Sequence, residues 1–188
     1  PAQCRLRIGA AVDESLGTVA QSAQDFPRAD SLFGTALRGY ERLGESRRIA
    51  WVWGSRGSVA FQRDDWVAAD TLYRHALAAR RAIGDIRMVG NALNALGSVA
   101  YRLHHLEDAW GFYHEARVVL EQTGERAALG TTLNYLGNVA AAAGRRDSAA
   151  IFYRAALDLT VALGDSAAAG AALQRARALT GVPGDRVP

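Results

Sequence analysis

Four histidines and one cysteine are the side chains of this sequence that could bind a metal ion or transfer a proton. His104 and His105 stand beside Glu107 and Asp108, a combination that could indicate a metal site or acid–base catalysis. Adjacent residues project in different directions, however, and no third ligand follows at a metal-binding spacing. We therefore interpret the two histidines as exposed turn residues.

The other candidates also lack chemical partners. His75 and His114 stand among Arg and Glu residues, as surface side chains usually do, and Cys4 has no identifiable base. The chain contains no phosphate-binding loop, no HExxH zinc motif and no nucleophile elbow. We therefore predict no catalytic residue, no metal site and no cofactor within this chain.

A repeat of 40 residues runs through the sequence. Each unit has a glycine followed two and three residues later by Val and Ala, and the four glycines are Gly17, Gly57, Gly97 and Gly137. Later in each unit an aromatic residue lies between two alanines, at Phe33, Tyr73, Tyr113 and Tyr153. A fixed period of this length is typical of stacked supersecondary units.

Each unit is predicted to contain two helices. Apolar residues recur at intervals of three and four, as at Leu93, Leu96 and Val99, and no alternating stretch indicates a strand. A glycine and an acidic residue close each unit, at Gly44-Glu45, Gly84-Asp85, Gly124-Glu125 and Gly164-Asp165. The glycine suits a left-handed helix C-terminus, and the acid can cap the next helix.

The four glycines spaced 40 residues apart lie inside the first helix of each unit. Glycine there costs roughly 1 kcal/mol relative to alanine, so we infer that it lets the two helices of a unit approach closely. The alanines of the second helix are expected to serve the same purpose. The aromatic residue between them is expected to fill the gap to the neighbouring unit.

This pattern resembles the tetratricopeptide repeat. The longer variety, with LG in the first helix and A-x3-[FY]-x2-A in the second, is similar to repeats of bacterial signalling proteins, spindle-orientation adaptors and kinesin light chains. The resemblance implies an all-α, right-handed solenoid of four helix-turn-helix repeats and a C-terminal capping helix. The expected ranges are a solenoid over 1–180, with repeats at 4–43, 44–83, 84–123 and 124–163 and a cap at 165–180, and a tail or linker at 181–188.

Repeats one and two each depart from the pattern at one position. Asp13 stands where the other units have Trp53, Leu93 and Leu133, and in repeat two Arg56 replaces a leucine. Repeat one is therefore expected to be partly exposed, or to pack against an upstream unit.

The resemblance also implies that the first helices line a concave, peptide-binding groove. Offsets of three, four and seven residues place side chains on one face of a helix. The predicted peptide-binding residues on this face are Trp51, Asn91, Asn94, Ser98, Tyr101, Arg102, Asn134 and Asn138.

Asparagine amides suit this role because they both donate to and accept from a peptide backbone. In the related adaptor families such residues hold bound peptides; Asn94, Asn134 and Asn138 match them, and we expect these three to be exposed. Trp51 and Trp53 are two residues apart, so at most one of them faces the core. The alternative is that these polar side chains are simply solvated.

Composition limits the partners further. The chain has 188 residues, all 22 of its basic residues are Arg, and its formal net charge is only +3. Scattered arginines favour no nucleic-acid site, and no apolar run is long enough to cross a membrane. An Arg-only, Ala- and Gly-rich composition indicates a GC-rich, bacterial genome, and we expect a cytoplasmic protein.

These observations predict a non-catalytic scaffold or sensor domain of a larger bacterial signalling or regulatory protein, binding a protein or an extended peptide. Other domains of the parent protein are expected as additional partners, and self-association is left open. Two alternatives remain: a structural spacer or oligomerisation module, and a fragment of a multidomain protease, cyclase or kinase whose active site lies elsewhere.

Overall fold

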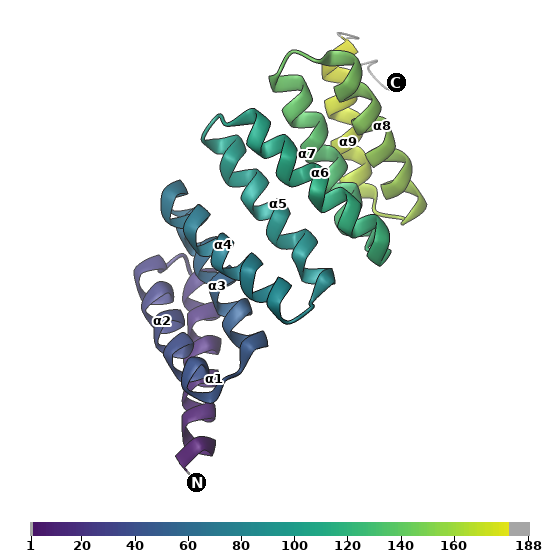
Figure 1. The fold of residues 1–188 in the computed structure, drawn as a ribbon. Helices are drawn as coiled ribbons and strands as arrows, with labels where there is room; N and C mark the ends of the chain where they lie inside the picture. Colours follow the sequence, from purple (N-terminus) through teal and green to yellow (C-terminus); the bar gives the residue numbers. More distant parts are fainter. Residues whose placement is uncertain (1, 181–188) are drawn as a thin grey trace. The chain divides into compact units, whose positions relative to one another are not determined.

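The computed structural model describes residues 2–180, and within that range the chain folds into helices joined by short turns, with no strand (Figure 1). The helices are α1 (Ala2–Ser22), α2 (Phe26–Leu43), α3 (Ser46–Gln62), α4 (Trp66–Ala82), α5 (Ile86–Arg102), α6 (Leu106–Thr123), α7 (Arg126–Ala142), α8 (Arg146–Ala162) and α9 (Ser166–Thr180). The all-α fold is as predicted. The predicted tail at 181–188 lies outside the described residues.

The chain divides into two compact units, Pro1–Val99 and Ala100–Pro188. In the first unit α1 packs against α2, α2 against α3, and α3 against α4. In the second unit α6 packs against α7, α7 against α8, and α8 against α9. These helices therefore pack mainly against their neighbours in sequence, as expected of stacked repeats.

Left-handed residues end the helices at a fixed place in each repeat. Gly44, Gly84, Gly124 and Gly164 have φ angles of 67°, 70°, 71° and 72°, as predicted for helix C-termini. In three repeats the turn after the first helix contains a non-glycine residue with positive φ, at Gln24, Asp64 and His104, and Gly144 takes this place in the fourth. His104 is exposed and therefore occupies a turn position.

The acidic residues after the glycines cap the next helix only in part. Asp165 does so, because its Oδ1 accepts from the Ala168 N–H at 3.0 Å. Glu45 and Glu125 make no such hydrogen bond, so the prediction that they cap helices is wrong for these two. The longer Glu45 side chain reaches outwards instead and pairs with Arg7 on α1.

Close helix approach at the repeated glycines is confirmed at three of the four positions. A Cβ atom at Gly17, Gly57 or Gly137 would lie 2.8, 2.6 or 2.5 Å from the ring of Phe33, Tyr73 or Tyr153, respectively. Each aromatic ring therefore covers the glycine of its own repeat. Phe33 and Tyr113 also contact Trp51 and Tyr135 of the next repeat, with 5.9 and 5.0 Å between ring centroids, as expected of a residue that fills the gap between repeats.

The apolar face of α1 is open to solvent. Val12, Leu16 and Val19 are each at least 43% exposed. Their counterparts Val52 and Val59 in α3, and Leu136 and Val139 in α7, are buried, because α2 and α6 pack against those helices. The expectation that repeat one is partly exposed is thus confirmed.

Arg56, the second departure, is accommodated by local partners. Its Nε donates to Asp30 Oδ1 at 2.7 Å, and its guanidinium lies 5.7 Å from the ring centroid of Trp53. The carboxylate of α2 and the indole of α3 thus take the place of the apolar surroundings that bury Leu96 and Leu136 in repeats three and four.

Candidate peptide-binding site

We call the first helix of each repeat (α1, α3, α5 and α7) a first-type helix and the second (α2, α4, α6 and α8) a second-type helix. The first unit contains an open cavity of about 280 Å³ beside the first-type helices α3 and α5. It is lined by Gln21, Trp51, Gly54, Ser55, Ser58, Tyr73, Arg80, Met88, Asn91 and Ala95. Pockets that hold small ligands usually measure about 300–1,000 Å³. This cavity lies near the lower end of that range, and it has room for a single anchoring side chain.

Trp51 forms one wall of the cavity. It is 36% exposed, and its ring meets Phe33 edge-on with 5.9 Å between ring centroids. Trp53 packs against the core of the first unit and stacks on His75 at 4.7 Å. Only one of the two tryptophans therefore faces the core, as predicted, and Trp51 presents an indole surface to the cavity.

Arg80 lies inside the cavity wall and is only 9% exposed. Position 80 aligns with the buried Tyr40, Leu120 and Thr160, so this arginine is buried although arginines on helices are usually solvated. Its Nη1 donates to the Met88 carbonyl oxygen at 3.1 Å. Burial lowers the pKa of the guanidinium, while the more distant Asp85 opposes that shift.

Tyr73 and Gln21 provide further polar groups. Burial raises the pKa of Tyr73 to about 12, further above physiological pH than that of an ordinary tyrosine. Gln21 Nε2 donates to Ser58 Oγ at 3.0 Å and to Gln62 Oε1 at 3.3 Å, which ties α1 to α3. Gln21, Ser58 and Tyr73 all line the cavity.

The asparagines of α5 differ in exposure. Asn91 is exposed, lines the cavity, and has its Nδ2 3.7 Å from Met88 Sδ. Asn94 is half-buried, and Ser98 Oγ donates to its backbone oxygen at 3.0 Å. The structure thus brings Trp51 and Asn91 together at one cavity.

In the second unit the predicted exposure of Asn134 is wrong. Asn134 is 8% exposed; its Nδ2 donates to the Gly130 oxygen at 3.3 Å, and its Oδ1 is buried without a hydrogen-bond partner. Position 134 is less than one helical turn from Gly137, so it turns towards the packed side of α7. Asn138 is half-buried, and its Oδ1 accepts from the Tyr153 hydroxyl at 2.8 Å.

Two other predicted site residues belong to the second unit. Tyr101 is half-buried and packs against the core around Ala100 and Tyr113, whereas Arg102 is exposed. Sequence reasoning missed Arg80, Tyr73 and Met88 as lining residues. Alignment of position 80 with Leu120 was the signal that could have revealed Arg80.

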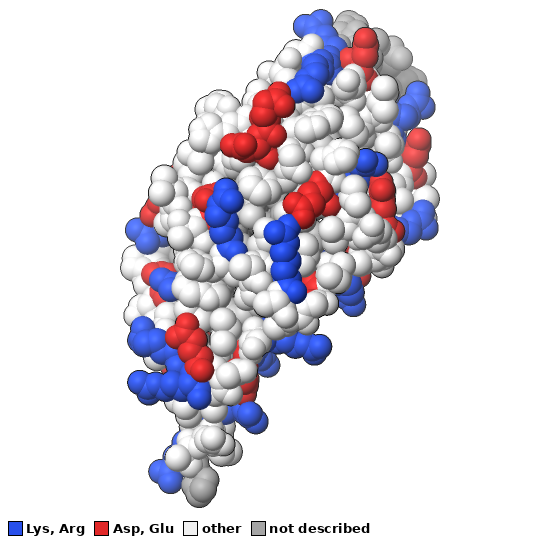
Figure 2. Space-filling view, in the orientation of Figure 1, with Lys and Arg blue, Asp and Glu red and all other residues white. Residues whose placement is uncertain are grey.

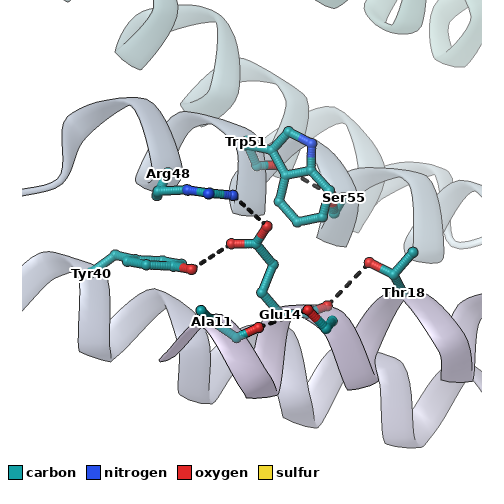
Figure 3. A network of polar contacts seen from close by, with 8 residues as sticks. Ala11, Glu14, Thr18, Tyr40, Arg48, Trp51 and Ser55 are labelled. Atoms are coloured by element: carbon teal, nitrogen blue, oxygen red, sulfur yellow. Dashed lines mark hydrogen bonds and ion pairs between the residues drawn. The ribbon is translucent and has the colours of Figure 1, made fainter. Parts of the chain in front are cut away.

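The equivalent place in repeat one holds an internal ion pair (Figure 3). Glu14 Oε2 accepts from the Tyr40 hydroxyl at 2.6 Å, and Glu14 Oε1 accepts from Arg48 Nη1 at 2.8 Å. The Glu14 side chain is only 12% exposed. Position 14 corresponds to Gly54, so repeat two has no such carboxylate.

Nucleic-acid sites, metal sites and membrane spans are each marked by features that can be compared with the described residues 2–180. On the face drawn in Figure 2, the Arg side chains alternate with Asp and Glu without forming a continuous basic stripe. Among residues 2–180 no group of three or more His, Cys, Asp or Glu is placed to hold a metal ion. No helix in that range has the length and apolar character that a membrane span requires.

Comparison with solved structures places this fold among tetratricopeptide-like helical repeat proteins. Aspartyl phosphate phosphatase F from Bacillus subtilis has a TM-score of 0.86 at 13% identity, and the match covers 90% of this chain and 45% of that one. A signal transduction ATPase with a tetratricopeptide repeat sensor from Pyrococcus horikoshii has a TM-score of 0.85 at 13% identity, covering 93% and 27%. BtubC from P. vanneervenii has a TM-score of 0.73 at 20% identity, covering 98% and 87%.

These likenesses confirm the resemblance predicted from the repeats at the level of the fold. The chain spans less than half of the phosphatase and about a quarter of the ATPase. No protein-family model matches the chain. No curated protein matches it either.

Proposed function

We propose that this chain is a non-catalytic recognition module that binds an extended peptide segment of a partner protein. In this proposal the first-type helices of the first unit carry the binding surface, with Trp51 and Asn91 at its centre. Asn94 and Ser98 on α5 extend it. In the second unit, Tyr101, Arg102 and Asn138 are proposed separately as peptide-contacting residues of that unit. The module acts as a sensor or scaffold within a larger bacterial signalling or regulatory protein.

The observation that carries the proposal is the cavity beside Trp51. An indole that is 36% exposed lies next to polar groups from α3, α4 and α5. Aromatic side chains in such positions are the usual anchors of protein interfaces. The Asn91 amide can donate to one peptide group and accept from the next.

The comparisons support the same class of function. The structure from Pyrococcus horikoshii contains a tetratricopeptide repeat sensor within a signal transduction ATPase. That sensor domain is a precedent for the role proposed here. The effector in this proposal lies on another part of the parent protein.

A peptide-display selection on the purified chain, followed by titration of the best peptide, tests the proposal. We expect Trp51→Ala to weaken binding by about 2 kcal/mol, or roughly 30-fold, because it removes an aromatic anchor. Asn91→Ala should weaken binding by about 0.5–1.5 kcal/mol, the usual net value of one hydrogen bond.

Val67→Ala provides the matched control, because it removes an exposed apolar side chain that does not line the cavity. Circular dichroism checks that each variant is folded. Wild-type affinity in the Trp51→Ala variant would place the binding surface elsewhere, on the second-type helices.

A second candidate role, self-association, is favoured by the open apolar face of α1. Val12, Leu16 and Val19 are exposed where their counterparts in α3 and α7 are covered by a neighbouring helix. If two copies pair through this face, light scattering should show a dimer that Leu16→Glu converts to a monomer. A wild-type chain that is monomeric at high concentration would exclude this role.

A further inference from the structure

Arg80 is a buried cation without a carboxylate partner. Its one hydrogen bond within the described chain goes to the Met88 carbonyl oxygen, and no carboxylate of those residues lies within ion-pair distance of it. Asp85 acts on it only from a greater distance. No acidic side chain lines the cavity. Buried charges are normally paired, so this guanidinium calls for a counter-ion.

In repeat one, a carboxylate of the chain itself occupies the position that corresponds to this cavity. There Glu14 supplies a carboxylate, and Tyr40 and Arg48 donate to its two oxygens (Figure 3). All three residues change in repeat two. Gly54 replaces Glu14, Arg80 replaces Tyr40, and Met88 replaces Arg48.

These replacements leave one positive charge and remove the negative one. A Cβ atom at Gly54 would lie 3.0 Å from Arg80 Nη2, so the guanidinium lies beside the place where a side chain of residue 54 would begin. The space in front of it is the cavity of about 280 Å³ that Trp51 and Asn91 also line. An anion that enters this cavity from outside can reach the donors of Arg80.

We infer that the Arg80 cavity receives the side-chain carboxylate of an Asp or Glu residue in the bound peptide. This inference rests on the proposed peptide-binding function and adds the chemical class of the anchoring residue. The ligand carboxylate takes the place that Glu14 fills in repeat one. Guanidinium donors suit it, because they match the two oxygens of a carboxylate.

The test uses two libraries of heptapeptides with acetylated and amidated ends. They are identical except that the central residue is Asp or Glu in one and Asn or Gln in the other. The wild-type chain should select from the acidic library. The best acidic peptide should bind at least about tenfold more tightly than its amide analogue, as expected of a charge-assisted hydrogen bond.

Two variants then assign this preference to Arg80. Arg80→Met keeps an apolar stem of similar size, and replacement of a buried charge in this way often leaves a protein folded. It should reduce the ratio of the two affinities to about one, whereas Arg81→Met, with the same loss of charge at an exposed neighbouring position, should leave the ratio unchanged. Gly54→Glu should also abolish the preference, because it supplies an internal carboxylate as Glu14 does.

The outcomes separate the inference from the proposed function. Peptides that bind with no acidic preference, or with a preference that survives Arg80→Met, would overturn the inference and leave the recognition module in place. If no peptide binds from either library, the proposed function fails as well. Tighter Arg80-dependent binding of a neutral peptide with a free C-terminus, or of a phosphoserine peptide, would overturn the assignment to an acidic side chain.

Discussion

Gly137→Ala should lower the free energy of unfolding by about 1–3 kcal/mol, whereas Gly111→Ala should raise it by up to about 1 kcal/mol. Both glycines lie inside helices of the second unit. A Cβ atom at Gly137 would lie 2.5 Å from the Tyr153 ring, whereas a Cβ atom at Gly111 meets nothing within 4 Å. The same chemical change therefore has opposite expected effects.

The reason is a competition between helix propensity and packing. Alanine gains about 1 kcal/mol over glycine in a helix interior, and at the exposed Gly111 this gain is realised in full. At Gly137 the buried ring of Tyr153 has to move to admit the new methyl group, and the resulting overpacking outweighs the gain. Urea denaturation of both variants measures the difference. Equal stabilisation by the two substitutions would show that the helices do not need this close approach.

Deletion of residues 165–188 should lower the melting temperature by roughly 5–10 °C. The helix α9 packs on α8, where its Ala172 is fully buried and its Ala176 contacts the cluster of Ala140, Ala149 and Tyr153. Loss of α9 exposes this surface, and we estimate its cost at about 2–3 kcal/mol; each kcal/mol shifts the melting temperature by about 2–4 °C in a chain of this size.

A chain that ends at residue 180 is the control for this deletion, because it retains α9 in full. Its melting temperature should equal that of the complete sequence. If the chain ending at residue 164 melts at the same temperature as this control, α9 is not a cap, and the proposed role of residues 165–180 is wrong.

The repeat period made the helices and their close approach predictable. Gly17, Gly57 and Gly137 recur in register with an aromatic residue, and such coincidence requires a contact that is the same in each unit. Turn positions were also predictable, because glycine at Gly44 or Gly124 serves a backbone conformation that few other residues adopt.

The environment of single side chains was less predictable. Asn134 was expected to be exposed, but its position is less than one helical turn from Gly137, close to the edge of the buried face. Small differences in helix rotation decide on which side of this edge a residue lies. The same position carries Glu14, Gly54 and Asn94 in the other repeats, so the residue type alone does not reveal its exposure.

The burial of Arg80 was not readily predictable from the sequence for a related reason. An arginine on a helix is usually solvated, and the run Arg80-Arg81 reads as a charged surface. Its burial follows from the contact between α4 and the Met88 carbonyl of α5, which depends on the neighbouring repeat rather than on α4 itself. The positive charge suits Arg80 to binding an anion, and the same charge is typical of an exposed side chain.

Photo-crosslinking of a selected peptide tests the central claim most directly. A benzophenone group placed next to the anchoring residue of the peptide should react with the chain near the cavity, and digestion with mass spectrometry identifies the modified residues. We expect crosslinks to α3 and α5 around Trp51 and Asn91. Crosslinks confined to the second-type helices α2 and α4, around Arg38 or Arg74, would contradict a binding surface on the first-type helices α3 and α5.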